Sequence, residues 1–200
     1  MSGLVVTGGL IVGGYLLGTV PTALVVGRRL GHDPTAEGSG NPGASNVYRL
    51  AGRRAGLVVA LVDLAKGAVP AAVASLVVGR PGADWVWLAA VAGHVWPVTR
   101  RFRGGKGVAT AGGGGLVLAP VAGVVCLALF AAAVATTRIA AVGSLAMAVA
   151  YPLLLATLGR PGDEVAVAVV VAAVLVIRHR SNLARLVRGE ERRLGGRGPR

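Results

Sequence analysis

Charged, aromatic and cysteine residues are all scarce in this sequence, and each shortage excludes a class of protein. Only 14% of the 200 residues are charged against 54% hydrophobic, and the mean hydropathy is +0.69, outside the usual range of a soluble domain. Aromatics make up 4%, so the apolar mass is Val, Ala, Leu and 32 glycines. The single cysteine, Cys126, excludes a disulfide framework and a thiolate metal cluster, and we expect it to be buried and inert. Abundant small residues suit helices that pack closely in lipid.

The apolar residues fall into long runs separated by basic segments. A helix that crosses the hydrocarbon core needs about 20 apolar residues. Pro120 lies near the middle of one 30-residue run, residues 108–137. As one helix this run would be about 45 Å long against a core of about 30 Å, so we predict two shorter helices, either full spans or a re-entrant pair. The candidate spans are residues 4–27, 55–79, 84–99, 108–137, 139–158 and 163–179.

The positions of lysine and arginine favour seven spans over six. With seven, residues 28–54 and 99–107, Arg138 and the segment from Arg178 onward share one side of the membrane, which then carries 18 of the 21 basic residues. Because basic loops remain in the cytoplasm, we predict an all-α polytopic membrane protein with seven transmembrane helices, the N-terminus outside and the C-terminus cytoplasmic. The net charge of +13 therefore indicates topology and not nucleic-acid binding. Residues 1–194 are expected to form a single membrane-embedded domain, and 195–200 a disordered basic tail.

The first polar segment, Gly38 to Arg49, is rich in small polar residues and reads Gly-Ser-Gly-Asn-Pro-Gly-Ala-Ser-Asn-Val-Tyr-Arg. Its glycines allow tight turns in which successive N–H groups can form an anion-binding nest. Ser39 and Asn41 add a hydroxyl and an amide, and Arg49 adds a planar donor fork suited to phosphate. Ser45 is predicted to cap a short helix that carries Arg49 toward the same place. The alternative is an ordinary cytoplasmic loop, with glycine for turning and arginine for topology.

The second polar segment, Arg100 to Thr110, sets Lys106 inside a glycine-rich turn before an expected helix start near Val108. It is not a Walker A loop, because Lys106 is followed by glycine and not by Ser or Thr. The open backbone and the lysine nevertheless suit a phosphate, toward which the positive end of the next helix would point. His94 is expected at the end of the preceding span, near this turn. The alternative is that the arginines hold the membrane interface and the glycines serve close packing.

The third polar segment follows the last span and reads Arg178-His-Arg-Ser-Asn. His179 and Asn182 lie three residues apart, on one face of a helix. The apolar residues that follow predict an interfacial amphipathic turn. A stop-transfer cluster is the alternative.

Two charged residues, Asp63 and Lys66, are expected inside the bilayer, three residues apart on one helix face. Either they pair with each other, or they orient a cytoplasmic loop. No spacing of His, Cys, Asp or Glu indicates a metal site.

Together the three polar segments resemble the bacterial acyl-phosphate:glycerol-3-phosphate acyltransferase family, known as PlsY. That family carries a Gly-Ser-Gly-Asn-x-Gly-Ala-Thr-Asn-Val-x-Arg loop, a Gly-His…Pro…Phe-x-Gly-Gly-Lys-Gly-Val-Ala-Thr loop and an Arg-His-x-x-Asn segment. Here these stand as Gly38 to Arg49, Gly93 to Thr110 and Arg178 to Asn182, and the likeness covers nearly the whole chain. The chain departs from the family pattern at Pro42, Ser45, Arg103, Ala141 and Ser181. Ala141 stands where a serine is expected, which leaves Ser144 as the nearby hydroxyl.

The resemblance implies transfer of a fatty acyl group from acyl phosphate to the 1-hydroxyl of sn-glycerol 3-phosphate. The products are lysophosphatidic acid and inorganic phosphate, in the first acylation step of phospholipid synthesis. The residues implied as catalytic are Ser39, Arg49 and His179. Those implied for the glycerol phosphate group are Gly104, Gly105, Lys106 and Gly107. Those implied to hold the acyl phosphate are Ser39, Asn41 and Arg49, and those that orient the glycerol are His179 and Asn182. The other substrate-binding residues implied are Gly38, Gly40, Asn46, His94 and Ser144.

Neither a metal nor a cofactor is expected, because acyl phosphate is already activated. The general base stays open between His179 and a substrate phosphate, whose second pKa is about 6. We expect a multi-pass protein of the bacterial inner (cell) membrane with its active site on the cytoplasmic face. Its partners would be the bilayer and its two substrates, without nucleic acid, and the working expectation is a monomer. A transporter for a small organic phosphate is the rival of another class, whereas a structural scaffold would leave the Gly-Ser-Gly-Asn sequence unexplained.

Overall fold

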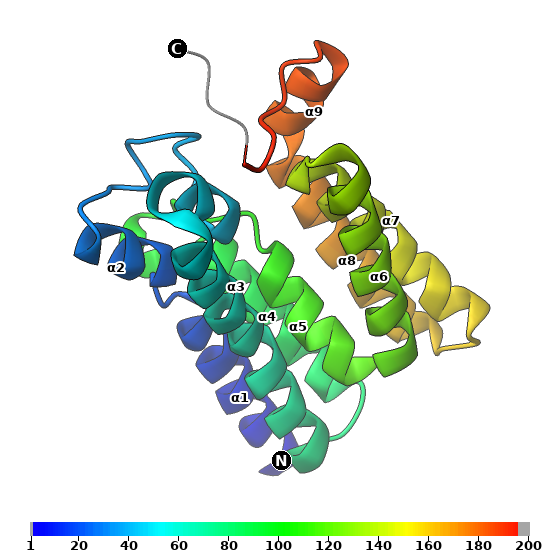
Figure 1. Cartoon of the computed structure of the whole chain (residues 1–200). Coiled ribbons are helices and arrows are strands. Elements are labelled where there is room, and N and C mark those ends of the chain that lie inside the picture. The colour runs from blue at the N-terminus through cyan, green and yellow to red at the C-terminus, as the bar shows by residue number, and fades with distance from the viewer. Residues whose placement is uncertain (1, 196–200) are drawn as a thin grey trace. The chain divides into compact units, whose positions relative to one another are not determined.

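The structure is a computed structural model that describes residues 2–195, and every regular element in this range is helical (Figure 1). Backbone contacts divide the chain into two compact units, one ending at Val121 and the other starting at Ala122. The first unit contains α1 (Ser2–Gly18), α2 (Thr22–Arg29), α3 (Ala44–Val77), α4 (Gly82–Val95), the 3₁₀ turn η1 (Val98–Arg100) and α5 (Val108–Leu118). The second contains nearly all of α6 (Pro120–Thr137), followed by α7 (Ala140–Thr157), α8 (Gly162–Arg178) and α9 (Arg180–Val187).

Lipid, more than intrinsic propensity, explains why these segments are helical. Glycine and β-branched valine weaken helices in water, but inside a bilayer each backbone N–H and C=O must find a partner within its own segment. Large apolar side chains accordingly face outward, and Leu4 and Leu76 are 83% and 89% exposed. The helical segments long and apolar enough to cross a membrane are Gly3–Arg29, Ala44–Val77, Pro120–Thr137 and Ala140–Thr157, with Val108–Leu118 a shorter apolar helix.

The first unit is a bundle in which α3 contacts α1, α4 and α5, and α1 also packs against α4. Glycines let the helix backbones touch. A Cβ on Gly18 would collide with the carbonyl of Ala90 between α1 and α4, and one on Gly113 would collide with that of Leu64 between α5 and α3. This is the packing expected of small residues in lipid. Figure 1 shows α2 and the loop that follows it at the end of the bundle opposite the N-terminus. The polar loops of this unit are therefore presented at one end.

The second unit has an inside-out pattern that fits lipid. In α6 the buried residues are the small Ala122, Gly123 and Cys126, whereas Val121 and Val124 are exposed. A soluble helix would bury its large residues instead. α7 packs against α8, and α9 follows α8 directly, with His179 between them. The predicted burial of Cys126 is confirmed.

Several element boundaries follow from proline and glycine. The predicted division of residues 108–137 is confirmed, because α5 ends at Leu118 and α6 starts at Pro120. The predicted span 4–27 is present as an apolar segment, but its helix breaks before Pro21, which has no N–H to continue it. The prediction that Ser45 caps a helix was wrong. α3 starts at Ala44 with Gly43 in the capping position, so Ser45 lies within its first turn. Of the predicted disordered tail, residues 196–200 lie outside the described range.

Candidate active site

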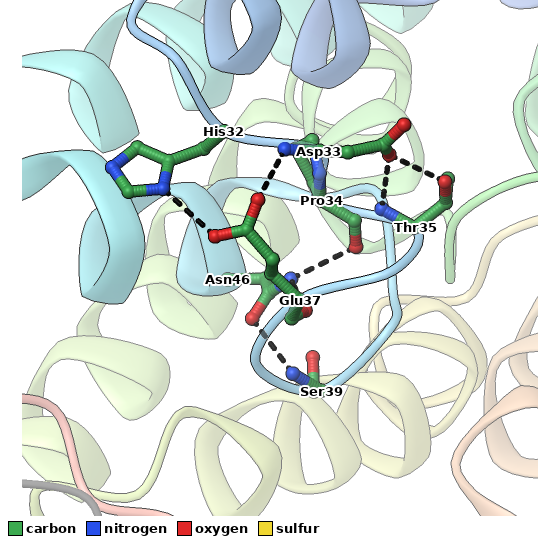
Figure 2. A network of polar contacts seen from close by, with 7 residues as sticks. All are labelled: His32, Asp33, Pro34, Thr35, Glu37, Ser39 and Asn46. Carbon is green, nitrogen blue, oxygen red and sulfur yellow. Dashed lines mark hydrogen bonds and ion pairs between the residues drawn. The ribbon is translucent and has the colours of Figure 1, made fainter.

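Asn46 organises the first polar loop, although it lies on α3. Its side chain is buried, with 1% exposed. The amide nitrogen donates to the carbonyls of Pro34 and Glu37, both at 3.0 Å, and the amide oxygen accepts the N–H of Ser39 at 3.0 Å (Figure 2). One side chain thereby fixes the loop backbone on both sides of Gly38.

Two carboxylates complete the loop (Figure 2). Glu37 accepts the N–H of Asp33 at 2.6 Å and lies 2.9 Å from the ring Nδ1 of His32. These contacts, the His32 ring first, lower the pKa of Glu37. Asp33 accepts the hydroxyl and N–H of Thr35 and pairs with Arg28 at 2.9 Å. These bonds, the Thr35 hydroxyl first, lower the pKa of Asp33 to about 2. Both groups are therefore ionised at neutral pH and act as acceptors that shape the loop.

The residues expected to touch a substrate lie on this shaped loop and just beyond it. Ser39 and Asn41 are half-buried, between exposed glycines and the start of α3. Gly38 has a φ of 63°, which favours glycine, and an added Cβ there would strike the amide oxygen of Asn46. Arg49 is half-buried and lies on the same face as Asn46, three residues later. The first two turns of α3 form a short helix, because Gly52 at φ 86° kinks the chain.

The glycine loop, residues 104–107, is held by main-chain carbonyls. The N–H of Gly104 donates to the carbonyl of Val95 at 3.1 Å, and the N–H of Gly105 donates to that of His94 at 3.1 Å. A Cβ on Gly105 would strike the His94 ring. Just before the loop, the Tyr15 hydroxyl donates to the carbonyl of Trp96 at 2.7 Å. In this conformation the two amides predicted to bind phosphate instead hold the loop against the end of α4.

The end of the glycine loop, Lys106 and Gly107, is better placed to bind an anion than the N–H groups of Gly104 and Gly105. Gly107 has φ 82° and ψ 0° and occupies the capping position of α5, and no described side chain caps this helix. Lys106 precedes it and is half-buried. A helix N-terminus beside a lysine combines N–H donors, the positive end of the helix dipole and a full charge.

A small, partly open recess is lined by residues of both loops of the first unit. Pro42 comes from the first loop and Gly105 from the glycine loop. Burial lowers the pKa of the Arg100 guanidinium, so a nearby anion would offset the cost of that burial. The Thr22 hydroxyl also lines the recess, is buried, and finds no hydrogen-bond partner among the described residues. Asp63, Lys66 and His94 line the recess as well.

In the second unit, His179 is buried between α8 and α9 with 3% exposed. Its Nδ1 lies 2.7 Å from the carbonyl oxygen of Leu175. A carbonyl only accepts, so this contact assigns the neutral ring's proton to Nδ1 and makes Nε2 the basic nitrogen. Ser144 on α7 is buried, and its hydroxyl donates to the carbonyl of Ala140 at 2.8 Å.

Asn182 is oriented by a residue that sequence reasoning missed. Its side-chain nitrogen donates to Glu191 at 2.9 Å, and the other oxygen of the same carboxylate accepts Arg185 Nε at 2.9 Å. The Glu191 side chain is 7% exposed. The segment after α9 therefore folds back to hold Asn182.

A family model for glycerol-3-phosphate acyltransferase matches residues 9–189. The chain belongs to this family. The curated glycerol-3-phosphate acyltransferase of Trichlorobacter lovleyi is 43% identical over 90% of this chain and 94% of its own. That of Rubrobacter xylanophilus is 42% identical over 94% and 95%. The crystal structure of the integral membrane enzyme PlsY in its glycerol 3-phosphate form has a TM-score of 0.91 at 34% identity, covering 94% of this chain and 96% of that one. The protein is therefore an integral membrane acyltransferase of phospholipid synthesis, and the predicted resemblance is confirmed.

Each predicted site residue of this acyltransferase can now be placed within its own unit. The first unit brings the loop of Ser39 and the loop of Lys106 to one recess, and the second unit carries Ser144, His179 and Asn182. Sequence reasoning missed the residues that hold these groups: Tyr15, Glu37 and Glu191. Glu37 and Glu191 adjoin predicted motifs, whereas Tyr15 lies in the first helix, far from them along the chain. The partners of all three are not visible from spacing. Among the described residues, no group of three His, Cys, Asp or Glu side chains could hold a metal ion.

Proposed function

We propose that this acyltransferase uses acyl phosphate as its donor and sn-glycerol 3-phosphate as its acceptor. The 1-hydroxyl attacks the acyl carbon, the acyl–phosphate bond breaks, and the hydroxyl proton leaves to a base. The products are lysophosphatidic acid and inorganic phosphate. The observation that carries the proposal is the recess at which Pro42 of the first loop and Gly105 of the glycine loop lie together, because this reaction needs two phosphate groups close together. Holding them in line supplies roughly 7–11 kcal/mol of barrier reduction.

The glycerol phosphate group binds at Lys106, Gly107 and the first N–H groups of α5. The left-handed backbone at Gly107 and the lysine beside it support this assignment. Gly104 and Gly105 contribute by allowing the loop to approach α4 closely, which their bonds to Val95 and His94 support. The phosphate of PlsY's bound glycerol 3-phosphate is the chemical precedent.

The acyl phosphate binds at Ser39, Asn41 and Arg49. Arg49 offers a planar donor fork to the phosphate and to the charge that develops as it leaves. Asn46, which the sequence placed among the binding residues, acts instead by holding Ser39, because its amide is already engaged with three backbone groups. Gly38 and Gly40 provide the left-handed turns.

His179 and Asn182 of the second unit orient the glycerol, and Ser144 of the same unit is a further substrate-binding residue. The contact between Nδ1 and Leu175 supports Nε2 of His179 as the group that receives the hydroxyl proton. The second candidate is an oxygen of the substrate phosphate. A pH profile of His179→Gln separates them, since a substrate base would leave the profile's shape unchanged.

The proposed topology is seven spans, with α1–α2 as the first, the N-terminus outside and residues 1–194 working as one domain in the inner membrane, as a monomer. The family match across residues 9–189 supports a single functional domain. The 18 basic residues that seven spans assign to one side support the orientation. Labelling of single cysteines placed at Arg54 and Arg160 with a membrane-impermeant thiol reagent in intact cells tests it: only the second should react.

The function is tested with purified protein in detergent, palmitoyl phosphate and glycerol 3-phosphate. We expect lysophosphatidic acid and inorganic phosphate in equal amounts, and only when both substrates are present. Lys106→Ala should raise the KM for glycerol 3-phosphate at least tenfold. Arg54→Ala removes an exposed cation of the same unit and should leave the KM for glycerol 3-phosphate within twofold of the native value. A folded preparation without lysophosphatidic acid production would overturn the proposal, and uptake of glycerol 3-phosphate into proteoliposomes would then favour a transporter.

A further inference from the structure

The pair Asp63 and Lys66 is more deeply buried than a stabilising contact requires. The two residues are 3% and 4% exposed, and Lys66 Nζ lies 2.6 Å from Asp63 Oδ1. Taking two charges out of water costs several kcal/mol for each ion, and apolar residues of similar volume often replace such a pair without loss of stability. A buried pair inside a membrane helix is therefore a candidate for function.

Lys66 connects the pair to the break between α1 and α2. Its ammonium group also donates to the carbonyl of Val20 at 2.7 Å. The break arises at Pro21, whose missing N–H interrupts the helix. The Val20 carbonyl also accepts the N–H of Thr22 at 3.0 Å, so Lys66 adds a second, charged donor at the break.

Asp63 connects the pair to both sides of the glycine loop. Its Oδ1 lies 4.0 Å from Nδ1 of His94, and the same ring nitrogen lies 3.2 Å from the hydroxyl of Thr110. His94 precedes the loop and accepts the N–H of Gly105 through its carbonyl. Thr110, which is fully buried, lies in the first turn of the helix that follows the loop.

The backbone around Thr110 is held by the same turn of α3. A Cβ on Gly67 would collide with the carbonyl of Thr110, so α3 and α5 touch directly beside the ion pair. The ion pair therefore lies beside His94, which precedes the loop, and reaches Thr110, which follows the loop, through the His94 ring.

We infer that Asp63 and Lys66 are positioning residues that fix the glycine loop through His94 and Thr110. This inference rests on the proposed function, because it states why the loop must be fixed: Lys106 and the first N–H groups of α5 must face a phosphate with little freedom. Since positioning errors of about 1 Å can reduce catalysis about a hundredfold, a displaced loop would bind glycerol 3-phosphate poorly.

The test removes the pair without leaving a lone buried charge. The double variant Asp63→Asn/Lys66→Met keeps the side-chain volumes and loses both charges. Its matched control is Arg80→Met/Asp84→Asn, which removes another ion pair of the same unit at the other end of α4, where Asp84 is 1% exposed. A third variant, Thr110→Val, keeps the pair and removes only the hydroxyl that contacts His94.

The first readout is hydrogen–deuterium exchange of peptides covering residues 99–107 in the full-length protein in detergent. We expect the amides of Gly104 and Gly105 to exchange at least tenfold faster without the Asp63–Lys66 pair and about threefold faster in Thr110→Val. The control should stay within twofold of the native rate. Native-like exchange without the pair, or equal acceleration in the control, would overturn the inference.

The second readout is steady-state kinetics. The KM for glycerol 3-phosphate should rise at least fivefold without the pair, while the KM for palmitoyl phosphate stays within twofold. Equal increases in both KM values would contradict a role confined to the glycine loop. A native chain that produces no lysophosphatidic acid would defeat the proposed function, but the exchange measurement would still decide the positioning role.

Discussion

The two polar loops of the first unit are held by different kinds of contact. The first loop is held by side chains: Asn46 bonds three backbone groups, and Glu37 and Asp33 accept N–H groups of the loop. The glycine loop is held by main-chain carbonyls at the end of α4, which accept the N–H groups of Gly104 and Gly105.

This difference determines what each loop tolerates. A loop held by side chains fails when a side chain is deleted or protonated. In a loop held by main-chain carbonyls, deleting a side chain such as Tyr15 acts only through neighbouring residues, whereas an added Cβ pushes the loop and the end of α4 apart directly. Ser39 lies in the loop that side chains hold, and Lys106 lies in the loop that main-chain carbonyls hold. The two proposed phosphate sites should therefore respond to different substitutions.

The largest effect is expected from Gly105→Ala. The added Cβ would collide with the His94 ring, so either the ring or the loop must shift. We expect kcat/KM for glycerol 3-phosphate to fall about a hundredfold, or about 2.7 kcal/mol. Gly13→Ala is the control, because a Cβ there meets nothing within 4 Å. A loss below threefold in Gly105→Ala would contradict the close approach.

Asn46→Ala should have the next largest effect and should act on stability. Loss of three hydrogen bonds, one buried and two partly buried, is expected to cost about 2 kcal/mol. All three tryptophans, Trp85, Trp87 and Trp96, lie in the first unit, so their fluorescence during thermal unfolding reports on it. Asn46→Asp keeps the acceptor for the Ser39 N–H and should lose about half as much. Equal losses in both variants would argue against separate roles for the two ends of the amide.

Tyr15→Phe should have a smaller effect on the glycine loop. The Tyr15 hydroxyl bridges the carbonyl of Trp96 and the N–H of Val98, and its loss costs about 1 kcal/mol. We expect the KM for glycerol 3-phosphate to rise about threefold, with the KM for palmitoyl phosphate unchanged. A rise in the KM for palmitoyl phosphate alone would contradict this assignment, because it would connect Tyr15 with the first polar loop.

The smallest expected effect is that of acid, which should destabilise the first polar loop and leave the glycine loop unchanged. Contacts lower the pKa of Asp33 from 3.8 to about 2 and lower that of Glu37 from 4.5. Their contribution to stability is therefore complete above about pH 5 and is lost as the pH falls through the lowered values. Exchange of peptides covering residues 33–46 should accelerate below pH 4.5 after correction for intrinsic rates, and Asp33→Asn/Glu37→Gln should remove this dependence. The glycine loop contains no carboxylate and should not respond; a matching response there would contradict the comparison.

The sequence was informative where one residue type determines the local structure. The break at Pro120 and the helix start at Val108 were both predicted and are confirmed. The hydrogen bonds of Asn46 were not predictable, because they join residues seven to twelve positions apart. The spacing of residues in the sequence does not show how the loop between them closes. The sequence left two interpretations of Asp63 and Lys66 open. Their pairing is confirmed at 2.6 Å, and the contact between Asp63 and His94, which depends on how α3 and α4 pack, supports the inferred role in positioning the loop.

Separate phosphate sites are tested by isothermal titration of glycerol 3-phosphate into detergent-solubilised native protein, Ser39→Ala and Lys106→Ala. Because we assign glycerol 3-phosphate to the glycine loop, Lys106→Ala should weaken its binding at least tenfold while Ser39→Ala stays within threefold of native. If Ser39→Ala weakened binding as much as Lys106→Ala, the two loops would not serve separate phosphates, and the division between them would be wrong.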